Sequence, residues 1–335
     1  MNALKKWAAV TVLVTGATGF FGGWLVRSLV GRGARVVAVV RSHKPDSQFF
    51  QEGFDQRVAL EWGSVYDPGF LDGVLRRHKP DYFFHAAYGA DVNRALTEPL
   101  ECFRSSVEST WLALEAIRQN HLPTASIIVS SDKAYGSQPL PYEENKPLTP
   151  VHPYEVAKAS LDLAAQSYGK VYGLPVAVTR CGNFFGPYDF NFTRLIPGVI
   201  RALESNDAPT LRSDGKFTRD FLYVEDAADA HLVLAEQVAS SKDLRGEPFN
   251  FSYGMQIEVI EIVRRIIDIS GSAIEPVTTD GVQAEIRHMR LSSDKARRRL
   301  GWKPRVGFDE GLRRTVAWYQ RYFRAIHPVS SDVKA

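Results

Sequence analysis

The chain has 335 residues, 44% of them hydrophobic, and can bury a large core in one big α/β domain, with or without a smaller addition. Its 41 basic and 38 acidic residues nearly balance, which argues against a nucleic-acid or membrane partner. Cys102 and Cys181 lie far apart in apolar contexts, a pattern that favours a reducing compartment over a disulfide or metal site. No apolar run is long enough to span a bilayer, so we expect a cytoplasmic protein without a metal.

A glycine-rich turn follows the first predicted strand. The strand covers residues 9–14, the turn reads ThrGlyAlaThrGlyPhePheGly at residues 15–22, and apolar residues recur at helical spacing from Trp24 onward. Such a turn leaves backbone N–H groups at the positive end of a helix, with glycines where a Cβ would block a pyrophosphate. The turn therefore predicts a dinucleotide site, although a purely structural turn is the alternative.

The second predicted strand, residues 35–40, ends at Arg41. An acidic residue at this place accepts hydrogen bonds from the ribose hydroxyls of NAD. Arg41 and the basic, polar residues 42–44 suit a 2′-phosphate better, which points to NADP. The alternative is that Arg41 covers the adenine and points to solvent.

Further strands and helices alternate along the first half. Strands are predicted at 57–61, 82–87 and 125–129, and helices at 68–78 and 98–120. This βαβαβ order predicts an α/β fold with a Rossmann-type, doubly wound parallel sheet. The small residues Ala86 and Ala87 let a cofactor pass close to a strand end, while His85 is expected to be a packed, hydrogen-bonded histidine.

Ser131, Asp132 and Lys133 follow directly after the predicted strand at 125–129. Open α/β sheets bind ligands at the carboxyl ends of their strands, so a hydroxyl, a carboxyl and an amine are brought to a ligand edge. A capped turn that uses Ser131 and Asp132 is the structural alternative.

Tyr154 and Lys158 are four residues apart on a helix predicted to follow Pro153. Residues at this spacing lie one above the other, so the ammonium can favour the ionised phenol. Moving a phenol pKa from about 10 toward 7 takes roughly 4 kcal/mol. One cation at ~4 Å supplies about that much at an effective dielectric near 20. We therefore expect Tyr154 to act as a base; a solvated helix face is the alternative.

Together these motifs resemble the extended short-chain dehydrogenase/reductase family, also called the NAD-dependent epimerase/dehydratase family, over nearly the whole chain. The matching pieces are residues 15–22, HisAlaAla at 85–87, SerSerAspLys at 130–133, TyrGluValAlaLys at 154–158 and ArgAspPheLeuTyrValGluAsp at 219–226. Ser-Asp-Lys before the Tyr-Lys pair is most similar to the nucleotide-sugar 4,6-dehydratases, notably those of CDP-glucose. Arg41, Ser64 and Ser106 depart from the pattern and leave NAD versus NADP open.

The resemblance implies a nucleotide-diphosphate hexose substrate, tightly bound NAD or NADP, and a homodimer. Tyr154 would remove the sugar 4-hydroxyl proton while Ser131 bonds the same oxygen, and Lys158 would bond the cofactor ribose. Lys133 would take the C5 hydrogen as Asp132 protonates the departing 6-hydroxyl. A lysine base must be desolvated or lie near another cation. The implied cofactor contacts are Gly16, Thr18, Gly19, Phe20, Phe21, Gly22, Arg41, Ala86, Ala87, Tyr154 and Lys158.

The chain is predicted to divide near residue 180. Residues 1–180 form the NAD(P)-binding Rossmann domain, and 181–330 mainly a smaller α/β substrate-binding region, with some segments returning to the first. By the resemblance, the substrate contacts are Asn183, Asn191, Arg194 and Arg219, the last reaching the diphosphate that a guanidinium matches bidentately. A surface ion pair is the alternative for each arginine. Asp220 and Asp226 are expected to fix loops or cap helices.

Two other functions remain open on the same scaffold. A sugar epimerase or reductase would use Asp132 and Lys133 only to position substrate. A catalytically silent, cofactor-bound protein would keep the fold without the reaction. The homodimer rests on the helices around 98–120 and 154–172, which carry more apolar positions than one face against a sheet requires.

Overall fold

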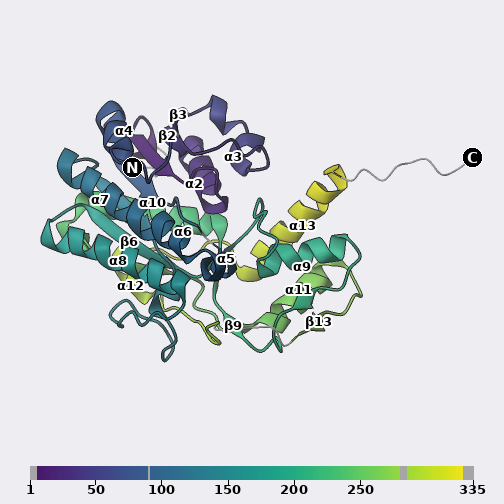
Figure 1. Ribbon diagram of the computed structural model, residues 1–335. Coiled ribbons are helices and arrows are strands. Elements are labelled where there is room, and N and C mark those ends of the chain that lie inside the picture. The colour runs from purple at the N-terminus through teal and green to yellow at the C-terminus, as the bar shows by residue number, and fades with distance from the viewer. Residues whose placement is uncertain (1–5, 90, 280–284, 327–335) are drawn as a thin grey trace, which may run out of the picture.

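A computed structural model of the protein describes residues 6–89, 91–279 and 285–326. Its centre is a seven-stranded parallel sheet in the order β11-β6-β5-β4-β1-β2-β3 (Figure 1). The predicted Rossmann-type α/β fold is confirmed. The strands are β1 (Thr11–Thr15), β2 (Arg35–Val40), β3 (Ala59–Trp62), β4 (Tyr82–His85), β5 (Ala125–Val129), β6 (Val176–Cys181) and β11 (Pro248–Phe251).

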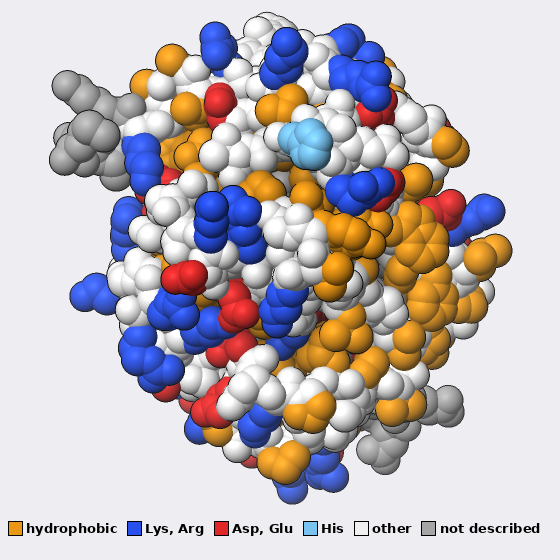
Figure 2. Space-filling model, turned by 90° about the vertical axis from the view of Figure 1, so that its left-hand side faces the viewer, with side chains coloured by type: hydrophobic (Ala, Val, Ile, Leu, Met, Phe, Trp, Pro, Cys, Tyr) orange, Lys and Arg blue, Asp and Glu red, His pale blue; other side chains and the backbone are white. Residues whose placement is uncertain are grey.

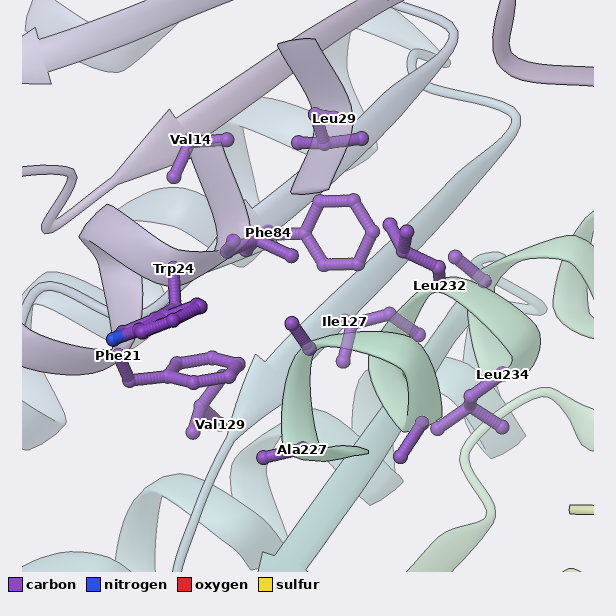
Figure 3. Packing of buried hydrophobic residues seen from close by; sticks show 14 of the residues in the cluster. Val14, Phe21, Trp24, Leu29, Phe84, Ile127, Val129, Ala227, Leu232 and Leu234 are labelled. Atoms are coloured by element: carbon purple, nitrogen blue, oxygen red, sulfur yellow. The ribbon is translucent and has the colours of Figure 1, made fainter. Parts of the chain in front are cut away.

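Successive side chains of the buried strands point to opposite faces of the sheet and contribute to two hydrophobic layers. On one face, Val12 and Val14 belong to a cluster with residues of α2 (Phe20–Gly31) and α10 (Val224–Ser240). On the other face, Leu13 packs with residues of α4 (Phe70–His78), α7 (Ser109–Asn120) and α8 (Pro153–Val171). Figure 3 shows the first layer, with strand residues such as Phe84 and Ile127 close to the side chains of both helices.

The predicted helix at 98–120 is broken. After α5 (Val92–Thr97), the chain forms α6 (Pro99–Phe103), a π-helical turn (Arg104–Glu108) and then α7. Pro99 at the first turn of α6 lacks an N–H and so starts a helix instead of continuing one. The expected single helix is therefore three consecutive helical pieces, preceded by α5, which the apolar pattern did not reveal.

A second group of elements forms the smaller lobe, drawn on the right of Figure 1. Helices α9 (Leu195–Glu204), α11 (Val259–Ser270) and α13 (Phe308–Ile326) share a separate hydrophobic cluster. Three two-stranded sheets lie in the smaller lobe or at its border. They pair β7 (Asn183–Phe185) with β10 (Phe221–Tyr223), β9 (Thr218–Arg219) with β12 (Ile257–Glu258), and β8 (Thr210–Leu211) with β13 (Val277–Thr278). The remaining elements are α3 (Gln48–Gln51), α12 (Asp294–Leu300) and 3₁₀ turns at Phe54–Gln56, Asp132–Tyr135 and Lys242–Leu244.

The expected loop-fixing roles of Asp220 and Asp226 are confirmed. Asp220 accepts bonds from the backbone N–H groups of Phe221, Met255 and Leu291, and Asp226 from those of Arg305 and Val306, so both fix loops. Both cysteines are free and buried. In the part of the chain that the structure describes, no helix is long and apolar enough to cross a membrane.

A buried ion pair ties α8 to the sheet. Arg180, on β6, donates from Nε and Nη2 to the carboxylate of Asp162 at 2.8 and 2.9 Å, and both side chains are at most 2% exposed. Its Nη1 also donates to the Tyr135 hydroxyl at 2.9 Å, which in turn donates to Asn250 Oδ1 on β11. One guanidinium thus joins α8, two strands and the 3₁₀ turn after β5.

We predict that Asp162→Asn lowers the free energy of unfolding by about 3–5 kcal/mol, because it leaves the Arg180 charge buried without its counter-ion. Urea unfolding followed by circular dichroism measures the change. Glu310→Gln, which removes one partner of the exposed pairs with Arg313 and Arg314, is the control and should leave the midpoint near that of the wild type. A midpoint for Asp162→Asn as high as that of the control would contradict the role given to the buried pair.

Candidate active site

A cleft of about 1030 Å³ opens where β1, β4, β5 and β6 end. The strand order reverses between β1 and β4, the point where open α/β sheets form a ligand crevice. The cleft runs from the glycine turn to α9 and the β8 and β9 segments of the smaller lobe. Its volume lies at the upper end of the range for ligand pockets.

The glycine turn shapes one end of the cleft. Gly16 has φ +74°, and a Cβ there would lie 2.5 Å from the carbonyl oxygen of Ala86, while a Cβ on Gly22 would overlap the Gly16 carbonyl. These two glycines allow the turn, α2 and the end of β4 to pack closely. Gly19 precedes α2 and no side chain caps the helix, so N–H groups of its first turn are available to an anion such as a pyrophosphate.

The predicted cofactor residues fall into two groups. Those in the lining of the cleft are Gly16, Gly19, Phe20, Phe21, Gly22, Ala86, Tyr154 and Lys158. Within the described chain, Thr18, Ala87 and Arg41 lie outside that lining. Arg41 is exposed, and its Nη1 donates to the Tyr66 hydroxyl at 2.8 Å.

Helix α8 begins where its sequence predicts. Pro153 occupies the first turn of α8, the His152 side chain accepts a bond from the Tyr154 N–H, and Glu155 reaches back to the N–H of His152. This capping box fixes the first turn. Tyr154 and Lys158 consequently face the cleft instead of a solvated surface, with side chains 8% and 3% exposed.

The expected ionisation of Tyr154 is wrong for this structure. Burial raises the pKa of the Tyr154 phenol to about 12, although the Arg194 cation lowers it. Burial also lowers the pKa of Lys158 to about 7. Desolvation outweighs attraction for both groups because the lysine Nζ lies 5.8 Å from the Tyr154 ring centroid and 3.8 Å from that of Tyr88.

Ser131, Asp132 and Lys133 occupy the start of the 3₁₀ turn after β5, and all three line the cleft. The Ser131 hydroxyl donates to Asp132 Oδ1 at 3.0 Å and accepts from the Lys133 N–H at 3.2 Å, so it also caps the turn. Asp132 Oδ2 is buried without a hydrogen-bond partner among the described residues. Such an oxygen, in a cleft, is free to meet a ligand.

The Asp132 and Lys133 pair is shifted toward its neutral form. Burial raises the pKa of Asp132, with the Lys133 charge opposing. Burial lowers the pKa of Lys133, and the nearby Arg219 cation lowers it further. The two conditions that a lysine base requires, desolvation and a neighbouring cation, are thus both present.

The predicted substrate residues line the other end of the cleft. Asn183 donates to the Asp220 carbonyl at 3.0 Å, and Asn191 Oδ1 accepts from the N–H and hydroxyl of Thr193. Arg194 contacts both oxygens of Asp189 at 3.0 Å. Arg219 pairs with Glu285 at 2.8 Å.

Tyr88, Asp189 and Glu285 are among the cleft residues that the sequence motifs did not reveal. Asp189 lies in the loop after β7, within five residues of Arg194, and that spacing was the available signal. Glu285 is 66 positions from Arg219, and no local pattern connects the two. His85, by contrast, is the predicted packed histidine: its Nδ1 and Thr15 Oγ1 are 2.8 Å apart, and burial lowers its pKa to about 3.

Comparison with known proteins defines the class. The model of the NAD dependent epimerase/dehydratase family matches residues 12–250. The chain belongs to this family, and it is an enzyme of the extended short-chain dehydrogenase/reductase type.

The relatives described next are named either as dehydratases or as epimerases. A dTDP-glucose 4,6-dehydratase from Shigella flexneri is 32% identical over 340 residues and is matched over 92% of both chains. The structure of a dTDP-glucose 4,6-dehydratase from Bacillus anthracis in complex with NAD aligns with a TM-score of 0.82 and 26% identity, over 93% of this chain and 97% of that one. A UDP-glucose 4-epimerase from Thermotoga maritima with UDP-glucose aligns with a TM-score of 0.84 and 25% identity, over 93% and 99%.

We predict that Gly22→Ala lowers the free energy of unfolding by about 1–3 kcal/mol, because its Cβ would collide with the Gly16 carbonyl. Gly31→Ala in the same helix is the matched control, since its Cβ would meet nothing within 4 Å. It should leave stability unchanged or raise it by up to about 1 kcal/mol through helix propensity. Equal effects of the two substitutions in urea unfolding would contradict the close packing of the turn.

Proposed function

We propose that the protein is a nucleotide-sugar 4,6-dehydratase, which converts a nucleotide-diphosphate hexose to the 4-keto-6-deoxy product with NAD or NADP bound in the cleft. The observation that carries this proposal is the buried Asp132 and Lys133 pair beside Ser131 and Tyr154. Elimination of water needs an acid and a base in addition to the groups that oxidise C4. The names of the Shigella flexneri and Bacillus anthracis relatives support the same reaction.

Each residue has a role that its position supports. Ser131 and Tyr154 hold the sugar 4-hydroxyl, and Tyr154 accepts its proton when the phenol is ionised, a form that the Arg194 cation favours and burial opposes. When bound, NAD(P) would supply the hydride acceptor for C4 and the hydride donor for C6. Lys158 would hydrogen-bond the cofactor ribose, and the uncapped first turn of α2 would hold the pyrophosphate.

The water-loss step uses the neutral form of the buried pair. A 4-keto group acidifies the C5 hydrogen, which an uncharged Lys133 removes, while a protonated Asp132 gives its proton to the departing 6-hydroxyl. Because burial raises the pKa of Asp132 and lowers that of Lys133, the neutral pair competes with the catalytically idle ion pair. Oδ2 of Asp132, which has no hydrogen-bond partner in the described residues, is the oxygen available to meet the 6-hydroxyl.

The finer assignments follow from single residues. Lys133 after Asp132 favours CDP-glucose as substrate, by its similarity to the enzymes that act on this nucleotide, although the relatives reported above are named for dTDP-glucose. Arg219 is placed at the diphosphate, where it would exchange Glu285 for phosphate oxygens. Arg41, exposed at the end of β2, leaves both NAD and NADP as cofactors.

An epimerase on this scaffold is the second candidate, because the Thermotoga maritima epimerase aligns as well as the dehydratase does. An epimerase needs no acid for a leaving hydroxyl. The two candidates therefore differ in what they predict for Asp132, and product mass after incubation with CDP-glucose, dTDP-glucose and UDP-glucose separates them.

We predict that Asp132→Asn slows water loss by roughly 10²-fold or more, because an amide cannot donate the proton that the 6-hydroxyl requires. Exchange of the C5 hydrogen with solvent deuterium should persist, since Lys133 remains. Mass spectrometry of the recovered nucleotide hexose follows both events. Tyr154→Phe is the control that should abolish both, because it blocks oxidation at C4. Dehydrated product from Asp132→Asn at near wild-type rate would place the acid elsewhere.

The protein is further proposed to be a homodimer. Hydrophobic side chains are exposed along α5, α6, α7 and α8: Leu96, Leu100, Trp111, Leu163, Val171 and Tyr172. Figure 2 shows hydrophobic side chains gathered on one part of the face that includes α7 and α8, while charged side chains of both signs cover the rest. A patch of this kind on a stable protein marks an interaction surface, and a second copy offers the same patch.

We predict that the protein elutes at twice the mass of one chain, and that Trp111→Glu with Leu163→Glu shifts it to a monomer, because each charge would be buried at the interface. Light scattering after size-exclusion chromatography at micromolar concentration measures the mass. Val277→Glu, at a similarly exposed apolar residue of the smaller lobe, is the control and should remain dimeric. A monomeric wild-type protein would refute the proposal.

A further inference from the structure

Lys158 contacts an aromatic ring where an acidic partner would be expected. Its Nζ lies 3.8 Å from the ring centroid of Tyr88, and its side chain is 3% exposed. Within the described parts of the chain, no carboxylate lies within ion-pair distance of this ammonium. A buried cation without a counter-ion needs another source of stabilisation.

Tyr88 is held in place from several sides. It follows the end of β4, and its ring meets that of His85 edge-on, with centroids 4.9 Å apart and an angle of 84°. Its hydroxyl is buried near Thr110 and Val129. Burial raises the pKa of the Tyr88 phenol well above its ordinary range, so the ring stays neutral whenever the protein is folded.

We propose that Tyr88 is a positioning residue for Lys158, whose ring face holds the ammonium in the cleft by a cation–π interaction. This interaction strengthens in a desolvated site. A ring face stabilises the charge without accepting a conventional hydrogen bond, so N–H donors of the lysine remain available to a ligand hydroxyl. A carboxylate in the same place would occupy those donors. The role assigned to Lys158 in the cleft rests on the proposed function.

The other titratable groups near Lys158 are mostly uncharged, so the Tyr88 ring is the neighbour that most favours the ammonium form. Cys102 of α6 would favour the ammonium only as a thiolate, and burial raises the pKa of this thiol above its ordinary value. His85 is neutral because burial lowers its pKa to about 3, and Tyr154 is neutral because burial raises its pKa to about 12. Asp132 and Lys133 of the 3₁₀ turn, shifted toward neutrality, line the same cleft. With burial lowering the pKa of Lys158 to about 7, any further loss of stabilisation changes its charge at neutral pH.

The substitutions Tyr88→Phe and Tyr88→Leu distinguish the effect of the aromatic ring on Lys158 from the effect of side-chain size. Phenylalanine keeps the aromatic face, whereas leucine keeps an apolar side chain and loses it. The pKa of Lys158 is measured directly by NMR of lysine-labelled full-length protein in one ligand state, with Lys158→Met to assign the signal. We expect Tyr88→Phe to stay close to the wild type and Tyr88→Leu to lower the pKa by about one unit. The alkaline limb of the pH–rate profile should move down by the same amount in the leucine variant.

Unchanged pKa in Tyr88→Leu, or an equal shift in Tyr88→Phe, would overturn the proposal. If Tyr88→Leu does not fold, as judged by its thermal unfolding transition, Tyr88→Met takes its place with the same expected shift. The NMR titration needs no turnover. A protein that forms no dehydrated product but shows the expected titration would refute the proposed reaction and leave the role of Tyr88 intact.

Discussion

The buried contact between Arg180 and Asp162 is the constraint on which the rest of the site depends. The proposed catalytic groups lie in two places in the chain, the turn after β5 and the first turns of α8. They can act together only if these elements keep a fixed distance. The guanidinium binds Asp162 on α8 and Tyr135 on the turn, while β6 supplies the arginine itself. A pair this deeply buried is costly to assemble, and its geometry is correspondingly specific.

A second physical effect in the site is the desolvation of its acidic and basic side chains. Tyr154, Lys158, Asp132 and Lys133 are all buried at the cleft, and in each case burial is the largest cause of the pKa shift. Desolvation moves every one of them toward its uncharged form. An uncharged amine can accept a proton and an uncharged carboxylic acid can donate one, so such a site suits a reaction with proton transfers in both directions. The arginines stay charged and provide the fixed positive field.

The features that could be predicted from the sequence are those formed by neighbouring residues. The glycine turn, the Ser131–Lys133 run and the spacing of Tyr154 and Lys158 are short motifs, and each lies where a predicted strand or helix places it. The pKa of Tyr154 departs from the expectation because the phenol itself is buried, and only the folded packing reveals this burial. Glu285 beside Arg219, and β7 paired with β10, join segments far apart in the chain. No pattern within one segment carries that information.

The seventh strand has a consequence for how the protein can be divided. β11 pairs with β6 although 66 residues separate the end of one from the start of the other, and α10, from the same stretch of chain, covers the first hydrophobic layer. A fragment that stops near residue 180 would lack an outer strand and expose the apolar surface that α10 covers. During synthesis, the sheet is therefore complete only after β11, which ends at Phe251, has left the ribosome. For the same reason, a single truncation of the chain does not yield the nucleotide-binding half as an independent module. Engineering that swaps substrate lobes between relatives must keep these returning segments with the sheet.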